Sequence, residues 1–291
     1  MKIKKLFLIS ATMLTLVNTI QNTWADNTYQ YEVLGSYANE NSDAGFDSNG
    51  YIAGIQAFLN PVIEGDYPYA ESSFVARQPF VAAAIGRVNA NVFSDEISGN
   101  LYMVGAAYAS KNFPVFAEIQ YIRSDQSGEI NRADVDFTTV SKNASLGVYF
   151  DDKTAAKFSY GKQNYEVNSA NSSEDGDENQ YEIAFKKLIS TPSASFVNVE
   201  ASASYEKDND SIENKNIGFL ADYYPNKTLG LGAGFILNKG DDKSDEGKYL
   251  VLKTRKYVAS NLAFGLLFSK FFADDSESDN QNIQIDAVFR F

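Results

Sequence analysis

The stretch IQIDAVFRF, residues 283–291, indicates the fold class because its side chains alternate in character without interruption. One face carries Ile283, Ile285, Ala287, Phe289 and Phe291, and the other carries Gln284, Asp286, Val288 and Arg290. A period of two residues is typical of a β-strand with two different environments. Chain ends of soluble domains tend to fray, whereas the last strand of a closed barrel pairs with the first and leaves no edge. We therefore expect a closed barrel; the terminal strand of a soluble β-sandwich is the alternative.

The same stretch resembles the C-terminal assembly signal of bacterial outer-membrane proteins. The resemblance rests on the final Phe291, on the aromatic Phe289 two residues earlier, and on the apolar residues at every second position before them. It implies that Phe289 and Phe291 form an assembly signal and that the barrel assembly machinery is a partner of this strand.

The N-terminal residues have the pattern of a secretory signal peptide. Lys2, Lys4 and Lys5 precede an apolar run over residues 6–17, which is too short to cross a bilayer, and Ala25 offers a small residue for cleavage. We expect residues 1–25 to be removed and residues 26–291 to form the mature protein; an uncleaved anchor is the alternative. No later apolar run is long enough for a membrane helix, so a membrane location would require strands.

Composition excludes several classes of function. The chain has no Cys and no His, which removes thiol chemistry, the usual general base and the commonest transition-metal ligand. We therefore expect no enzymatic activity, no catalytic or metal-binding residues and no cofactor. Removing the three signal lysines takes the net charge from −13 to −16, the wrong sign for binding nucleic acid. The mean hydropathy of −0.30 fits a transmembrane barrel, in which every second residue faces water.

Two kinds of connection alternate between the strand-like segments. Short ones lie at 110–114, 151–153, 190–193, 224–227 and 259–261, and acidic ones lie at 40–43, 174–178, 208–210, 241–246 and 274–279. Bacterial barrels show this asymmetry, with tight periplasmic turns and longer external loops. We therefore interpret the acidic clusters as external loops.

The connections delimit about fourteen strands. The predicted strands are 29–38, 49–59, 70–90, 100–109, 115–124, 135–150, 154–167, 180–189, 195–206, 214–224, 228–238, 248–257, 261–272 and 282–291. An even number places both chain ends on the periplasmic side. Residues 60–99 carry Pro61, Pro68 and Pro79, so twelve or sixteen strands stay open as alternatives.

The polar residues of each predicted strand fall on one parity, which we assign to the lumen. The charged pore-lining candidates are Glu32, Glu118, Lys157, Glu182, Lys186, Glu200, Asp222, Lys253, Arg255, Asp286 and Arg290, with Arg77 and Arg87 as further candidates in the uncertain region. Side chains fill a barrel of about eight strands, so fourteen strands imply an aqueous channel. The alternative is a merely solvated wall. Aromatic residues before the short turns, namely Tyr149, Phe150, Tyr223, Tyr224 and Tyr257, predict a periplasmic girdle.

Three further stretches carry a family resemblance. Residues 51–62 end in Asn-Pro-Val, residues 68–75 begin Pro-Tyr-Ala-Glu, and residues 112–118 read Asn-Phe-Pro-Val-Phe-Ala-Glu. With the final Phe-Arg-Phe, the chain resembles an outer-membrane porin family of gammaproteobacteria over nearly the whole mature length. The resemblance implies the barrel and the outer membrane, and it transfers no functional residues.

These observations predict an outer-membrane porin for passive diffusion of small hydrophilic solutes and ions, with a weak cation preference from its acidic loops. The alternative is a barrel that serves adhesion, receptor or structural roles through those loops. Expected partners are outer-membrane lipid and lipopolysaccharide, and no nucleic acid. The transported solute and the oligomeric state stay open.

Overall fold

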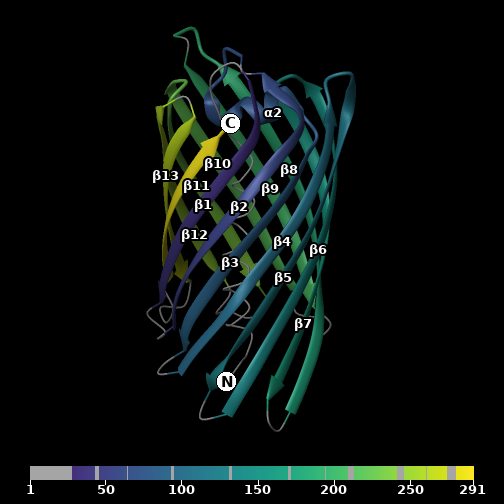
Figure 1. Ribbon diagram of the computed structural model, residues 1–291, viewed down its shortest axis with the longest axis vertical. Helices are drawn as coiled ribbons and strands as arrows, with labels where there is room; N and C mark the ends of the chain where they lie inside the picture. Colours follow the sequence, from purple (N-terminus) through teal and green to yellow (C-terminus); the bar gives the residue numbers. More distant parts are fainter. Residues whose placement is uncertain are drawn as a thin grey trace.

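The structure, a computed structural model, is a closed barrel of antiparallel strands (Figure 1). It describes residues 28–42, 46–63, 65–92, 95–130, 133–169, 172–193, 195–208, 213–240, 246–259, 261–273 and 280–291. Within these residues the strands are β1 Thr28–Ser42, β2 Phe46–Ile63, β3 Phe80–Val92, β4 Asp95–Ser110, β5 Phe113–Ile130, β6 Ala133–Asp151, β7 Thr154–Ser169, β8 Ser172–Ser190, β9 Phe196–Asp208, β10 Glu213–Asn226, β11 Leu229–Gly240, β12 Gly247–Ala259, β13 Leu262–Ala273 and β14 Asn280–Arg290.

Every strand pairs with its neighbours in sequence, and the last strand closes the barrel on the first. Glu32 of β1 lies opposite Arg290 of β14, and Val33 lies opposite Phe289. Closure satisfies the backbone groups of both outer strands, which is what a strand structure needs in lipid. The predicted fold class and the count of fourteen strands are confirmed; twelve and sixteen are not.

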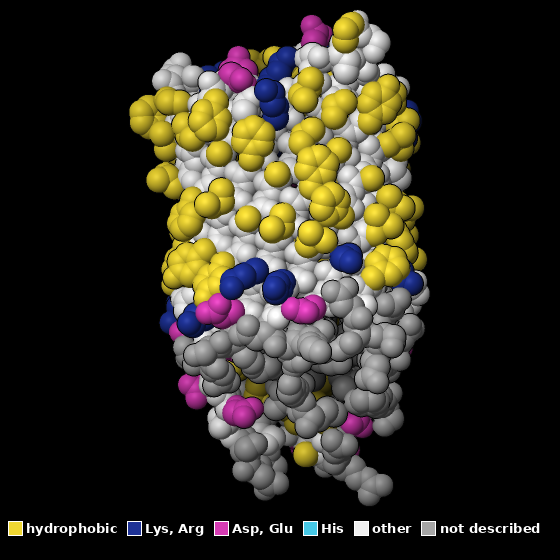
Figure 2. Space-filling model, turned by 180° about the vertical axis from the view of Figure 1, so that it is seen from behind, with side chains coloured by type: hydrophobic (Ala, Val, Ile, Leu, Met, Phe, Trp, Pro, Cys, Tyr) yellow, Lys and Arg dark blue, Asp and Glu magenta, His cyan; other side chains and the backbone are white. Residues whose placement is uncertain are grey.

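The outer face of the barrel is apolar. Large side chains such as Ile85, Leu146, Ile183 and Phe264 are exposed on it. Figure 2 shows hydrophobic side chains as a broad belt on the face that it presents. They recur at every second position because successive side chains of a strand point to opposite faces. Among the described residues, no helix is long and apolar enough to cross a membrane.

The two ends of the barrel differ. We call one the turn end: it carries the short connections at 111–112, 152–153, 191–195, 227–228 and 260–261, together with Thr28 and Phe291. We call the other the loop end: it carries the connections from β1 to β2, β3 to β4 and so on around the barrel. The signal peptide predicted at 1–25 lies outside the described residues.

The predicted strand 70–90 is wrong in its first part. Tyr69–Glu71 forms a 3₁₀ turn (η1), Ser72–Ala76 forms a short α-helix (α2), and the strand begins at Phe80. Arg77 ends the helix in a left-handed conformation, with φ of 50°, and Pro79, which has no N–H for the ladder, precedes β3. Figure 1 shows α2 at the same end of the barrel as the C-terminus.

The interpretation of 174–178 as an external loop is also wrong. Glu174, Asp175, Asp177 and Glu178 lie in β8, paired with β7. Strand β8 has 19 residues, whereas about 9–11 cross a bilayer, so its first part lies beyond the apolar belt. Glu40 likewise lies in β1 and Asp208 at the end of β9. Where water wets both faces of a sheet, apolar alternation disappears, and a strand reads as a polar loop.

Candidate functional site

The lumen at the turn end contains the segment between β2 and β3, residues 65–79, which we call the infolded segment. The backbone N–H of Tyr69 donates to the Lys227 carbonyl oxygen at 3.0 Å, and the Lys227 ammonium lies 2.9 Å from the Asp66 carboxylate. Lys227 belongs to the turn between β10 and β11, far around the barrel from β2 and β3. The infolded segment therefore crosses the lumen.

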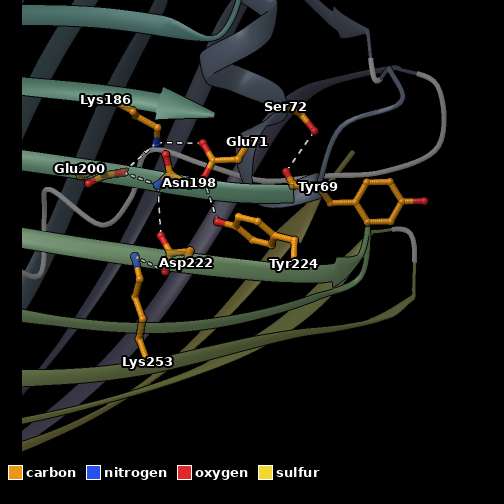
Figure 3. Close-up of polar contacts among 9 residues, drawn as sticks. All are labelled: Tyr69, Glu71, Ser72, Lys186, Asn198, Glu200, Asp222, Tyr224 and Lys253. Carbon is orange, nitrogen blue, oxygen red and sulfur yellow. Dashed lines mark hydrogen bonds and ion pairs between the residues drawn. The ribbon is translucent and has the colours of Figure 1, made fainter. Parts of the chain in front are cut away.

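Glu71 holds the centre of the infolded segment to the opposite wall (Figure 3). Its carboxylate lies 2.8 Å from the Lys186 ammonium of β8 and accepts a hydrogen bond of 2.8 Å from the Tyr224 hydroxyl of β10. The Lys186 ammonium also lies 3.0 Å from the Glu200 carboxylate of β9. One lysine thus bridges a carboxylate of the segment and a carboxylate of the wall.

The wall continues this network beyond the segment. The Asn198 side-chain amide donates to Glu200 at 2.8 Å and to Asp222 at 3.1 Å, and Lys253 pairs with Asp222 at 3.0 Å. Figure 3 shows these residues in a row across neighbouring strands. The wall therefore supplies one carboxylate to Lys186, that of Glu200, independently of the infolded segment.

Arg77 anchors the other end of the segment. Its guanidinium donates to the Asp151 carbonyl oxygen at 2.5 Å, pairs with Asp152 at 3.1 Å and lies 4.0 Å over the Tyr149 ring. A non-glycine residue in the left-handed region costs roughly 1–2 kcal/mol, which these contacts offset. Phe74 adds a ring contact with Tyr149 at 5.7 Å.

Apolar side chains of the segment complete its attachment. Ala70, Val75 and Ala76 are buried in one cluster with wall residues of the turn end, among them Leu188 of β8 and Val288 of β14. Burial raises the pKa of the Glu71 carboxyl, and the Lys186 ammonium opposes this shift. The attachment therefore combines apolar burial with ion pairs, among which the buried carboxyl of Glu71 has a raised pKa.

The eleven charged residues predicted to line the pore all point to the inner face of their strands. Besides the pairs above, Arg255 lies 2.9 Å from Asp286, Arg290 lies 3.4 Å from Glu32, and Lys157 lies 4.0 Å from Glu118, while Glu182 lies on the inner face of β8. Their part in conduction stays a prediction. Arg87 instead lies on the outer face of β3, because it shares the parity of the exposed Ile85.

Charges of the lumen separate along its axis. The inward cations Lys157, Lys186, Lys253, Arg255 and Arg290 lie in the half toward the turn end, each beside a carboxylate. Within the part of the chain that the structure describes, the inward charged residues nearest the loop end are acids: Glu40, Asp95, Glu174, Glu178, Glu206 and Asp208. The loop-end mouth is therefore negative inside.

The predicted periplasmic girdle is partly wrong. Phe150 and Tyr223 are exposed on the outer face, whereas Tyr149, Tyr224 and Tyr257 are buried on the inner face. There they contact the infolded segment; Tyr257 lies 5.4 Å from Tyr69 between ring centroids. The sequence carried a signal for this, since these three tyrosines share the parity of inward residues. Glu71 had none, because it lies outside any strand.

In the described ranges no group of three or more acidic side chains is arranged to hold a metal ion.

Comparison with known proteins gives one family and several similar structures. The model of a family described as "Putative general bacterial porin" matches residues 3–291. The outer membrane protein Omp33 of Acinetobacter baumannii is 18% identical, with a TM-score of 0.56, and the match covers 91% of this chain and 99% of that one. No match was found among the curated proteins.

Two barrels of other kinds are also similar. The translocator domain of the autotransporter NalP from Neisseria meningitidis is 11% identical, with a TM-score of 0.53, over 99% of this chain and 96% of that one. The toluene transporter TodX of Pseudomonas putida is 10% identical, with a TM-score of 0.51, over 94% and 92%. At such identities the likeness shows the fold alone.

Proposed function

The chain belongs to the family of general bacterial porins, and from that premise we propose that it forms a water-filled channel for passive diffusion of small hydrophilic solutes and ions. The observation that carries the proposal is the set of inward charges on fourteen strands. Side chains cannot fill so wide a barrel, and charges inside it require water.

The channel has a direction. Short turns of bacterial barrels lie in the periplasm, so we assign the turn end to the periplasm and the loop end to the cell exterior. The infolded segment then narrows the periplasmic mouth, since its contacts reach Lys227 and Lys186 on the far wall. We infer that it sets the size limit of the permeating solute.

The negative interior of the external mouth favours cations. Charge at a mouth concentrates counter-ions over a range of ~10 Å at 0.1 M salt. The inward cations lie deeper, and each has a carboxylate beside it. We therefore propose a modest cation preference that fades as ionic strength rises. We assign this preference to the acids on the inner face of the strands at the loop end.

Planar-bilayer recording of the refolded mature protein tests the proposal. We expect discrete conductance steps and a reversal potential of cationic sign in a salt gradient. A variant in which residues 66–77 are replaced by a short Gly-Ser turn should give larger steps, and Lys157→Met, which alters the lumen away from the segment, should not.

A folded barrel without conductance steps in either form would refute the channel. It would favour the alternative, in which the barrel presents its external surface for adhesion or receptor binding.

Phe291 supports a role for the last strand in assembly. Its backbone carbonyl accepts from the N–H groups of Gln30 and Tyr31, and its ring stacks on Tyr31 at 5.5 Å. The residue thus closes the seam between β1 and β14 on the lipid side. We propose that Phe289 and Phe291 present this seam to the barrel assembly machinery.

A further inference from the structure

One side of the lumen wall is apolar, although the inner face of a water-filled barrel is ordinarily polar. The inner face of β3 runs from Phe80 to Ala90 without a polar side chain, and that of β4 runs from Ile97 to Ala109 without one. Inner residues of β1 to β5 pack there in one cluster, which we call the inner apolar patch: Ala38, Ile52, Ala84, Val88, Ala90, Leu101, Met103 and Ile122. Such a patch offers contact to the apolar part of a ligand.

Glu40 of β1 lies at the loop-end edge of the inner apolar patch. It follows Ala38 by two positions on the same face of the strand, and it is 8% exposed. The inward cations that the structure describes lie in the half of the lumen toward the turn end, and none of them pairs with Glu40. Burying a carboxylate is costly unless a counter-charge lies beside it. Glu40 therefore has the charge to bind a cation from outside the described part of the chain.

The residues beside Glu40 are neutral hydrogen-bonding groups. Strands β14, β1 and β2 are neighbours in the barrel (Figure 1), and Glu40 lies opposite Asn282 on one side and opposite Ser48 on the other. The Cβ atoms of such opposite residues are about 5 Å apart, so the three side chains can contact one ligand. Asn282 is 7% exposed, and its buried amide oxygen accepts no hydrogen bond from the residues that the structure describes. A carboxylate, an amide oxygen and a hydroxyl together fit a positively charged group with several N–H donors.

The strand register joins these polar groups to the inner apolar patch. Ser48 lies opposite Ala90 of β3, which belongs to the patch, and Asn282 lies opposite Ser269 of β13. In this row, from β3 to β13, Glu40 is the one charged residue. A ligand whose charge lies at Glu40 therefore has apolar side chains beside it on β1, β2 and β3.

We propose that Glu40, Ser48 and Asn282, which we call the Glu40 site, bind organic ammonium ions that carry an apolar group. The ammonium donates to the Glu40 carboxylate and to the Asn282 amide oxygen, and the apolar group lies on the inner apolar patch. Hydrogen bonds between two charged groups are among the strong ones, and an ammonium has a donor for each acceptor of the site. The inference names a class of solute for the channel proposed above, and it rests on that function for the route by which the solute arrives.

Equilibrium titration of the refolded mature chain in a nonionic detergent tests the proposal. The probe is phenethylammonium. Phenethyl alcohol keeps the ring without the charge, and ethylammonium keeps the charge without the ring. We expect phenethylammonium to bind at least about tenfold more tightly than either, because a hydrogen bond to a charged group and a buried ring each contribute that much.

Two substitutions separate the two halves of the site. Glu40→Gln should weaken phenethylammonium binding at least about tenfold and leave phenethyl alcohol unaffected. Val88→Thr keeps the shape of the side chain but places a hydroxyl in the inner apolar patch, so it should weaken phenethylammonium and leave ethylammonium unaffected. Glu96→Gln is the matched control for Glu40→Gln, since Glu96 lies at the loop end of β4 but is exposed on the outer face.

Equal binding of the three probes, or an equal loss in Glu96→Gln, would overturn the proposal. So would displacement of phenethylammonium by calcium or ethylammonium at equal concentration, because the site would then recognise charge alone. The titration needs no membrane, so its outcome is independent of conductance. A barrel that conducts without binding the probe would refute the site, and a silent barrel that binds it would refute the channel and support the site.

Discussion

Replacing Lys186 by Met should release the infolded segment from the wall. Lys186 is the cation between two carboxylates, and the Glu71 side chain is 2% exposed. Removing one partner of a buried ion pair leaves the other charge uncompensated and costs ~3–5 kcal/mol. Glu200 is 38% exposed and accepts from Asn198, so the loss falls mainly on Glu71. The detached state of the infolded segment should therefore become at least ~10²-fold more populated.

A single cysteine measures this opening, because the chain has none of its own. Val75 is buried in the cluster that holds the segment, and Val75→Cys keeps nearly its size. The rate at which a thiol reagent labels this cysteine reports how often the segment leaves the wall. Lys157→Met in the same background is the control, since Lys157 pairs with Glu118 of the wall rather than with the infolded segment.

A second substitution separates this reasoning from a general loss of stability. Glu71→Gln keeps an acceptor for the Tyr224 hydroxyl and removes the charge, so alone it should change the free energy of attachment by only ~1 kcal/mol. Combined with Lys186→Met it should lower the labelling rate below that of Lys186→Met alone. If the double variant labels as fast as the single one, or if Lys186→Met labels like the parent, the reasoning is refuted.

Deletion of Phe291 should lower the amount of barrel in the outer membrane, measured by immunoblot, and leave the single-channel conductance of the surviving protein unchanged. Normal abundance of the deletion variant would contradict the assembly role. Glu174→Gln with Glu178→Gln should reduce the cation preference at low salt, measured as the reversal potential, whereas Asp175→Asn on the outer face should not. If neither variant changes the reversal potential, selectivity belongs to the deeper lumen. Because burial raises the pKa of Glu71, attachment of the infolded segment should be strongest below the ordinary carboxyl range and should weaken as pH rises through the raised pKa. Conductance should therefore grow as pH rises, and Glu71→Gln should flatten this dependence.

The sequence predicted the barrel because alternation survives wherever one face meets lipid and the other meets water. Residues 283–291 show this: Gln284, Asp286 and Arg290 point inward in the structure and Phe289 points outward. The eleven inward charges follow from the same rule. The alternation of apolar and polar side chains is lost beyond the belt, because water contacts both faces of the sheet there. For this reason the sequence predicted a loop at residues 174–178.

The infolded segment could not be predicted from a local pattern. Its helix has five residues, too few for a helical period, and its buried residues Glu71 and Ser72 are adjacent rather than alternating. Its stability comes from contacts with Lys186, Tyr224 and Lys227, which lie more than a hundred residues away. Alternation assigns each wall residue to the inner or outer face, but it does not give the register between strands. It could therefore not show that these side chains contact the infolded segment.

With the loop end at the cell exterior, as proposed above, the hairpins that continue past the apolar belt are what a molecule arriving from outside encounters. Strands β5 to β8 keep their ladder pairing far from the bilayer: Glu129 is still opposite Asp134, and Asn168 is opposite Ser173. An antibody or a phage fibre would therefore bind a rigid surface composed of neighbouring strands, with side chains from distant parts of the sequence side by side. Such recognition would be lost on heating the protein in detergent and could not be reproduced by linear peptides.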